Sequence, residues 1–298
     1  MKIHELLKYG RNVLSAAGVP DAEADAWLLL SDAVGLDRAG LFLYGTEPAA
    51  PEAEERYREM VADRAKRIPL QHITGKACFM GLTFHSDART LVPRPDTETL
   101  VEAVLAEKPS GGSLLDLCTG SGCVLLSYLM EQRRARGIGT DISVKALDTA
   151  LRNAGELGVL DRVSFVCSDL MDGEAEEVLS AACKEADTVH MILSNPPYIA
   201  SGEIDGLMEE VRLHDPRIAL DGGEDGLTFY RRICSMAPCL LAEGGYLAVE
   251  IGSGQGQAVT RLFEKAGFTE IGLKKDLAGS DRVVFGRLPD RSREKNGN

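Results

Sequence analysis

The sequence predicts an α/β protein in which a small N-terminal helical bundle precedes a parallel sheet with helices on both faces. Residues 1–73 show helical periodicity and no strand pattern. After about residue 94, short apolar runs alternate with helical segments, as is typical of parallel sheets. The last two β-like runs, in residues 268–288, have no helix between them, so we expect an antiparallel pair at the sheet edge.

Composition limits the functional classes. The 298 residues fit one large or two unequal domains, and the net charge of −13 disfavours sequence-independent binding of nucleic acid. Seven cysteines with no C-x-x-C pair indicate neither a disulfide framework nor a zinc site, and the five histidines lack metal-ligand spacing. No run resembles a signal peptide or a membrane span. We therefore expect a cytoplasmic protein without a metal or a membrane partner.

The first domain, residues 1–73, is expected to contain three to five helices. Gly18-Val19-Pro20 ends the first helix, and Asp21 and Gly35 delimit the second as its cap and its stop. A third helical stretch starts at Pro51.

Residues 74–93 are predicted to form a β-hairpin that links the two domains, with its reversal near Ser86-Asp87. The second domain spans residues 94–288. Residues 289–298, "PDRSREKNGN", are predicted to be a disordered tail.

A glycine turn follows the first strand of the second domain. In "LLDLCTGSGCVLLSYLM", Gly120 and Gly122 allow a sharp turn before a helix whose free N–H groups can bind an anion. The dinucleotide motif needs a third glycine where Leu125 stands, so the turn fits NAD poorly. A smaller nucleoside ligand such as S-adenosylmethionine fits better, and a purely structural turn is the alternative.

Acidic residues end the next two predicted strands. Asp141 lies 19 residues after Gly122, the spacing at which an acid reaches ribose hydroxyls in nucleotide-binding α/β folds. Its alternative role is to cap the next helix, which Ser143 could do instead. Asp169 could accept a hydrogen bond from adenine, with Leu170 beside the base, or could be a turn residue. Ligands of open α/β sheets bind at this edge of the sheet.

The fourth predicted strand ends in Asn195-Pro196-Pro197-Tyr198, here called the NPPY motif. The Asn195 side-chain oxygen and the Pro196 carbonyl can accept the two hydrogens of a planar NH₂ group, and proline stiffness fixes the second acceptor. Tyr198 offers a flat surface for stacking and for cation–π attraction. We interpret the motif as a holder for an amide or a base amine that receives a methyl group, without a metal or a strong base. A structural turn is the alternative.

Three motifs together resemble the release factor glutamine N5-methyltransferases: "SNPPYI", "LDLCTGSG" and "LVPRPDTETL". The resemblance covers nearly the whole chain. It implies a seven-stranded class I S-adenosylmethionine-dependent methyltransferase domain with an N-terminal helical bundle and a hairpin linker. The implied reaction methylates the glutamine of the Gly-Gly-Gln loop of class I peptide chain release factors and leaves S-adenosylhomocysteine. The helical domain would contact the protein substrate away from that glutamine, and no direct nucleic-acid partner is expected.

The resemblance also implies site residues. Those that touch the cofactor would be Cys118, Thr119, Gly120, Ser121, Gly122, Asp141, Asp169, Leu170 and Asn195. The glutamine would be held by Asn195, Pro196, Pro197 and Tyr198, of which Asn195, Pro196 and Tyr198 are the expected catalytic residues. Arg94 and Glu98 would lie near the mouth of the cofactor site, or else belong to the start of a helix. "LDGGEDG", residues 220–226, would be a mobile loop beside the NPPY motif, or a plain loop.

The sequence departs from the family pattern at two positions. Cys118 stands where a glycine is common, and a catalytic thiol there is conceivable, although no neighbour in sequence would activate it. Asp215-Pro216 replaces the more frequent Glu-Pro.

Three other functions share some of these features. A sister family methylates a glutamine of a ribosomal large-subunit protein, and Cys118 is closer to its pattern, whereas "PRPDTE" favours the release factor family. An adenine-N6 methyltransferase would need a basic surface, and only Arg133/Arg134/Arg136 and Lys274/Lys275 form small basic groups. A non-catalytic scaffold would have no need of Asn195.

Overall fold

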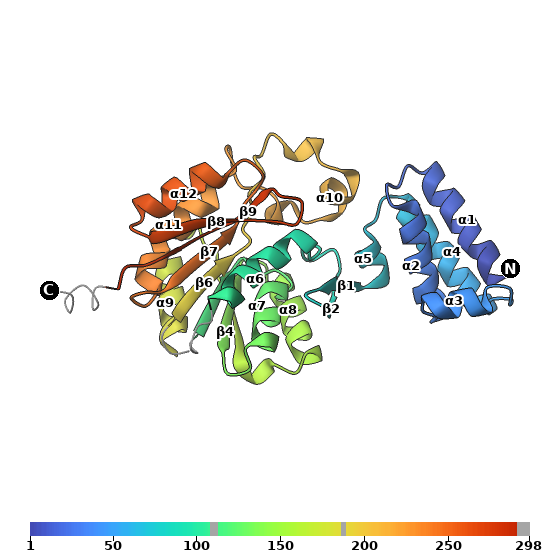
Figure 1. Ribbon diagram of the computed structural model, residues 1–298, viewed down its shortest axis with the longest axis horizontal. Coiled ribbons are helices and arrows are strands. Elements are labelled where there is room, and N and C mark those ends of the chain that lie inside the picture. The colour runs from blue at the N-terminus through green and yellow to red at the C-terminus, as the bar shows by residue number, and fades with distance from the viewer. Residues whose placement is uncertain (108–112, 186–188, 291–298) are drawn as a thin grey trace. The chain divides into compact units, whose positions relative to one another are not determined.

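The computed structural model describes residues 1–107, 113–185 and 189–290 (Figure 1). The chain forms two compact units. One contains Met1–Lys76 together with Met208–His214, and the other contains Ala77–Leu207 and the chain from Asp215 onward. In the predicted tail, residues 291–298 lie outside the described residues. No helix among the described residues is long and apolar enough to cross a membrane.

The first unit is helical. Its N-terminal stretch contains α1 (Ile3–Ala16), α2 (Ala22–Val34), α3 (Arg38–Tyr44), α4 (Pro51–Ala65) and α5 (Leu70–Thr74). Gly35 ends α2 in a left-handed conformation, as predicted, but the side chain of Asp21 makes no capping hydrogen bond. Tyr57 is completely buried and donates to the carbonyl of Ala26 at 3.1 Å. It passes directly over Gly10, where a Cβ atom would lie only 1.9 Å from the phenol oxygen.

A helix from a distant part of the sequence completes this unit. Helix α10 (Glu209–His214) belongs to it through Glu210, whose side chain is almost completely buried. Arg64 donates to Glu210 at 3.0 Å and Arg67 at 2.6 Å. Arg64 also donates to Asp25 at 2.6 Å. These charge-assisted hydrogen bonds balance the burial of Glu210 and lower its pKa against the opposing effect of desolvation.

The predicted hairpin is formed by β1 (Lys76–Phe79) and β2 (Leu82–His85). The predicted position of its reversal was wrong. The chain turns at Met80 and Gly81, which both have positive φ, at 51° and 72°. Such values are typical of a tight two-residue hairpin turn, and Gly81 is the residue that adopts them without strain. Ser86 and Asp87 follow the second strand instead.

The second unit contains a seven-stranded sheet with the strand order β5-β4-β3-β6-β7-β9-β8. The strands are β3 (Ser113–Leu117), β4 (Arg136–Asp141), β5 (Val163–Cys167), β6 (Val189–Ser194), β7 (Tyr246–Glu250), β8 (Thr269–Lys275) and β9 (Asp281–Arg287). The first five are parallel, and β9 pairs antiparallel with both β7 and β8, which confirms the expected antiparallel pair. The strand order reverses between β3 and β6, and ligands of open α/β sheets bind at such a point.

Helices cover both faces of this sheet (Figure 1). They are α6 (Glu98–Ala106), α7 (Cys123–Glu131), α8 (Val144–Glu156), α9 (Ala175–Glu185), α11 (Thr228–Leu240) and α12 (Gly256–Lys265). Two separate apolar cores result. Leu115 and Leu117 of β3 pack with residues of α9, α11 and α12, whereas Leu114 packs with residues of α6 and α7. Since side chains alternate along a strand, the apolar run in β3 supplies both cores.

Candidate active site

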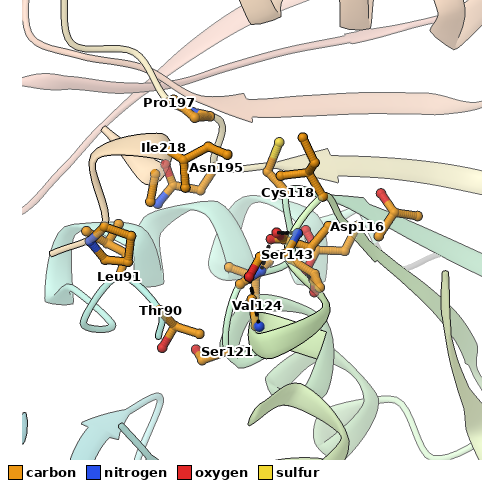
Figure 2. A pocket seen from close by; sticks show the side chains of 18 of the residues that line it. Thr90, Leu91, Asp116, Cys118, Ser121, Val124, Ser143, Asn195, Pro197 and Ile218 are labelled. Atoms are coloured by element: carbon orange, nitrogen blue, oxygen red, sulfur yellow. Dashed lines mark hydrogen bonds between the residues drawn. The ribbon is translucent and has the colours of Figure 1, made fainter. Parts of the chain in front are cut away.

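A pocket lies where β3, β4, β5 and β6 end, next to the point at which the strand order reverses (Figure 2). The parallel strands bring the predicted cofactor residues together here, except Gly122, which does not line the pocket, because the carboxyl ends of the strands meet at one edge of the sheet. In Figure 2, Asn195, Pro197 and Ile218 line one side of the pocket, and Ser121, Val124 and Ser143 line the other. The predicted site residues that line it are Cys118, Thr119, Gly120, Ser121, Asp141, Asp169, Leu170, Asn195 and Pro197.

The glycine turn forms the floor of this pocket. Gly120 and Gly122 both have positive φ, at 56° and 78°, and Gly122 is the N-cap of α7. A Cβ atom on Gly122 would lie 3.0 Å from Leu126 and 3.2 Å from Ala150, whereas Gly120 has open space beside it. Gly122 therefore packs the turn against two helices, and Gly120 leaves room for a ligand to approach the backbone.

Cys118 also adopts a positive φ, of 61°, a conformation that favours glycine. The turn forms with cysteine nonetheless. Burial, together with the charges of Asp141 and Asp116, raises the pKa of the Cys118 thiol far above its usual value. A thiol in this state is a poor nucleophile, so the geometry does not support a catalytic role for Cys118.

Asp141 is fixed by backbone hydrogen bonds. Its Oδ2 accepts from the N–H of Gly120 at 2.9 Å, and its Oδ1 accepts from the N–H of Ser143 at 2.9 Å. Ser143, and not Asp141, caps α8, because the Ser143 hydroxyl accepts from the N–H of Ala146 at 3.2 Å. Burial raises the pKa of Asp141, and the backbone hydrogen bonds partly offset this effect. Each carboxylate oxygen has a further lone pair that a ligand hydroxyl could use.

Asp169 and Leu170 lie beyond the end of β5. Asp169 accepts from the N–H of Met171 at 2.9 Å, so it does serve as a turn residue while it lines the pocket. Leu170 is buried, and Arg232 donates to its carbonyl at 2.8 Å. Arg232 thus fixes the backbone at Leu170, and both Asp169 and Leu170 line the pocket.

Several polar residues of the pocket were missed by sequence reasoning. Asp116 is 1% exposed, and burial raises its pKa to about 7, although a hydrogen bond from Thr119 at 2.6 Å opposes the shift. The hydroxyls of Thr90 and Thr140 are buried in the pocket lining and have no hydrogen-bond partner among the described residues. An acid within the apolar run "SLLDL" was a signal for Asp116, but no sequence signal distinguished the threonines.

The NPPY motif begins directly after β6. Asn195 and Pro197 line the pocket, whereas Pro196 and Tyr198 are not among its lining residues. The amide nitrogen of Asn195 donates to the hydroxyl of Thr97 at 3.2 Å. Tyr198 donates from its phenol to Glu250 at 3.2 Å. The side chains of Asn195 and Tyr198 thus each have a hydrogen-bond partner within the protein.

The segment "LDGGEDG" packs against the backbone of the NPPY motif. The N–H of Ile199 donates to Leu220 at 3.0 Å, and that of Gly222 donates to Ile199 at 2.8 Å. A Cβ atom on Gly222 would lie 2.8 Å from the carbonyl oxygen of Pro197. The side chain of Gln255 donates to the carbonyl of Tyr198 at 2.9 Å. The glycines of this segment therefore allow two backbone segments to lie in direct contact.

Arg94 and Glu98 have different surroundings. Arg94 lines the pocket and donates to Asp215 at 2.7 Å. The side chain of Asp215 is completely buried, so the shorter acid at this position does form a specific contact. Glu98 is not among the lining residues, and it accepts from the N–H of Met80 in the hairpin at 2.6 Å. Pro95 is the first residue of a 3₁₀ turn (Pro95–Thr97) that leads into α6, as the helix-start interpretation predicts.

The sheet order and the pocket at its switch point define a class I S-adenosylmethionine-dependent methyltransferase. Among solved structures, the catalytic domain of hMettl16 in complex with MAT2A 3'UTR hairpin 6 aligns with a TM-score of 0.55 at 14% identity and covers 78% of this chain and 83% of that chain. This similarity concerns the fold alone.

Sequence relatives define the family. A release factor glutamine methyltransferase of Cereibacter sphaeroides is 43% identical over 289 residues, 97% of this chain and 99% of that protein. One from Geobacter sulfurreducens is 40% identical over 286 residues, 96% of either chain. A family model described as PrmC N-terminal domain matches residues 5–75. The chain belongs to the release factor glutamine methyltransferase family.

Proposed function

We propose that this protein methylates the side-chain amide nitrogen of the glutamine in the Gly-Gly-Gln loop of class I peptide chain release factors. The observation that carries the proposal is that Asn195 lines the same pocket as Gly120 and Asp141. A group that can hold an amide thus lies beside residues suited to a nucleoside. The names of the relatives, all release factor glutamine methyltransferases, support the same substrate.

The pocket has the chemistry that S-adenosylmethionine requires. The carboxylate of Asp141 is suited to the ribose hydroxyls, and Asp169 with Leu170 to the adenine. The open side of Gly120 and the unpartnered hydroxyls of Thr90 and Thr140, within the described part of the chain, are suited to the amino-acid end. When bound, S-adenosylmethionine supplies an electrophilic methyl group.

The NPPY motif prepares the acceptor. The side-chain oxygen of Asn195 and the carbonyl oxygen of Pro196 accept the two hydrogens of the substrate amide, which fixes its plane and increases the electron density on its nitrogen. Tyr198 supports the planar group by stacking. The nitrogen would form its new bond to the methyl carbon as the carbon–sulfur bond of the donor breaks, which leaves S-adenosylhomocysteine, and would then release one hydrogen as a proton to solvent. Orientation supplies most of the acceleration in this scheme.

The helical unit is proposed to contact the release factor away from the reacting glutamine. Binding by two separate surfaces would allow the enzyme to distinguish a release factor from other proteins that carry an accessible glutamine. The seven cysteines, all free, support the expected location in the reducing cytoplasm. Cys118 is closer to the pattern of the ribosomal alternative, but the names of the relatives favour the release factor.

The test uses purified protein, labelled S-adenosylmethionine and three candidate substrates: a class I release factor, a ribosomal large-subunit protein fraction, and DNA or RNA. We expect label in the release factor, and mass spectrometry should place one added methyl group on the Gly-Gly-Gln glutamine. Replacing that glutamine by alanine in the release factor is the matched control. Label in the ribosomal protein or the nucleic acid, and none in the release factor, would refute the proposal.

A further inference from the structure

A buried acid lies beneath the NPPY motif. Glu250 is the last residue of β7 and is 2% exposed. Its Oε1 accepts the phenol hydrogen of Tyr198 at 3.2 Å. Its Oε2 completes no hydrogen bond within the described residues, although the hydroxyl of Thr97 is close enough to lower the pKa of this carboxyl group. Glu250 thus binds Tyr198 directly and lies near Thr97.

Thr97 connects this acid to Asn195. The Thr97 side chain is 2% exposed, and its oxygen accepts a hydrogen from the amide nitrogen of Asn195 at 3.2 Å. A hydroxyl has one hydrogen to donate and can also accept. When Glu250 is ionised, its carboxylate can only accept, so the nearby hydroxyl of Thr97 can direct its hydrogen towards it. The oxygen of Thr97 is then left to accept from Asn195.

This order of donors and acceptors decides which end of the Asn195 amide faces the pocket. With its nitrogen bound to Thr97, the amide presents its oxygen to the substrate. The opposite orientation would present an NH₂ group to the NH₂ group of glutamine, and two donors cannot bind each other.

We propose that Glu250 is a positioning residue that orients the amide of Asn195 through Thr97 and the phenol of Tyr198 by direct contact. The proposal rests on the function proposed above. Glu250 does not line the pocket, so it acts on the reaction only through these two neighbours.

The other ionisable groups around Glu250 are consistent with this role. Burial disfavours the ionised form of Glu250 and raises its pKa to about 7, as does the charge of Asp96 to a smaller extent, whereas Thr97, Arg282 and Tyr198 favour the ionised form. Tyr230 donates to the backbone carbonyl of Glu250 at 2.9 Å and leaves its carboxyl group to the other partners. Burial raises the pKa of the Cys123 thiol, and the charge of Glu250 raises it further, so this thiol stays protonated. The guanidinium of Arg282 is held by Asp276 at 2.9 Å.

The test compares Glu250→Gln, Thr97→Val and Thr97→Ser with the wild type. Glutamine keeps the shape of the acid but can donate a hydrogen to Thr97, which reverses the order of donors. Valine keeps the shape of threonine and removes the link, and serine keeps the link. For each protein we would measure, at pH 8 where Glu250 is mostly ionised, kcat and KM with a release factor, affinity for S-adenosylhomocysteine by calorimetry, and Tm.

For Glu250→Gln and Thr97→Val we expect kcat to fall at least about 30-fold, less than the roughly 10²- to 10³-fold known for loss of a direct active-site hydrogen bond, because both residues act through others. KM for the release factor and affinity for S-adenosylhomocysteine should change less than about threefold, because Glu250 does not line the pocket and valine keeps the shape of Thr97, which does. Thr97→Ser should retain most of the activity. Glu264→Gln, on the exposed surface of α12, is the control for loss of one carboxylate.

A wild-type kcat in Glu250→Gln or in Thr97→Val would overturn the proposal. So would a loss of activity that is matched by a loss of Tm and of cofactor affinity, since that pattern indicates a structural role alone. An inactive wild type would instead refute the proposed function, so the two failures can be distinguished.

Discussion

The carboxylate of Asp141 accepts a hydrogen bond from the backbone N–H of Gly120, with 2.9 Å between the two heavy atoms. The acid that ends β4 therefore holds the glycine turn that follows β3. A single residue thus both shapes the pocket floor and offers acceptors to a ligand.

Asp141→Ala should weaken cofactor binding, because it removes the proposed ribose acceptors and the partner of Gly120. We expect the affinity for S-adenosylmethionine to fall at least about tenfold, which corresponds to about 1.4 kcal/mol. Isothermal calorimetry measures this directly. Asp161→Ala, at an exposed position on the same unit, is the control. Unchanged affinity in Asp141→Ala would show that the assignment is wrong.

Asn195→Ala should show the opposite pattern. It removes one of the two acceptors for the substrate amide but little of the surface that holds the cofactor. We expect kcat to fall about 10²- to 10³-fold, while the affinity for S-adenosylhomocysteine stays within about threefold of the wild type. Single-turnover methylation of a release factor and calorimetry give the two values. Full activity in this variant would remove the NPPY motif from the mechanism.

Gly222→Ala should impair catalysis through the backbone of the NPPY motif. Its new Cβ atom would lie 2.8 Å from the carbonyl oxygen of Pro197 and from Cα of Tyr198, and neither backbone atom can move without shifting the motif. We expect a fall in kcat of about tenfold or more, since small misplacements of reacting groups are costly.

Gly202→Ala is the matched control for this variant. The position has open space around it and, like Gly222, does not have a positive φ. It should retain the wild-type kcat. Equal effects of the two substitutions would mean that the close contact at Gly222 has no functional consequence.

The charge of Glu250 should reduce stability above neutral pH. Burial raises its pKa from 4.5 to about 7. Because the folded protein disfavours the ionised form, this cost is absent below about pH 4.5, grows as pH rises, and reaches about 3 kcal/mol above pH 7. Glu250→Gln lacks the cost. Its Tm should therefore exceed that of the wild type at pH 8, and the difference should shrink towards zero near pH 4.5.

Differential scanning calorimetry across this pH range measures the effect. Asp116, whose pKa is also raised to about 7, is present in both proteins and so does not affect the difference. A variant that is less stable than the wild type at pH 8 would contradict the prediction.

Much of this fold could be predicted because its signals are local. Gly35 ends α2 and Ser143 caps α8 through contacts with immediate neighbours in the sequence. The parallel sheet followed from the alternation of apolar runs and helical segments. The hairpin reversal was placed wrongly because Met80-Gly81 lacks the asparagine or aspartate that usually marks such a turn, whereas Ser86-Asp87 has typical turn residues.

The sequence analysis identified site residues that directly follow strand ends. It missed residues that act by hydrogen-bonding to other site residues. Asp141 and Asn195 end strands, so the topology places them together. Thr97 and Glu250 reach the NPPY motif from segments 98 and 52 residues away from their partners, and no sequence pattern encodes such contacts. The one available signal was that Glu250 stands in the apolar run "YLAVEIG". The role of a buried acid depends on its neighbours in the fold, which the sequence does not show.

Because α10 belongs to the helical unit, the chain crosses between the two units three times. The chain passes from one unit to the other after Lys76, after Leu207 and after His214. A protein shortened to begin at Ala77 would keep Glu210 but lose Arg64 and Arg67, the two arginines that bind its carboxylate. Exchange of N-terminal regions between relatives should therefore succeed only when the segment that follows the NPPY motif is exchanged with them.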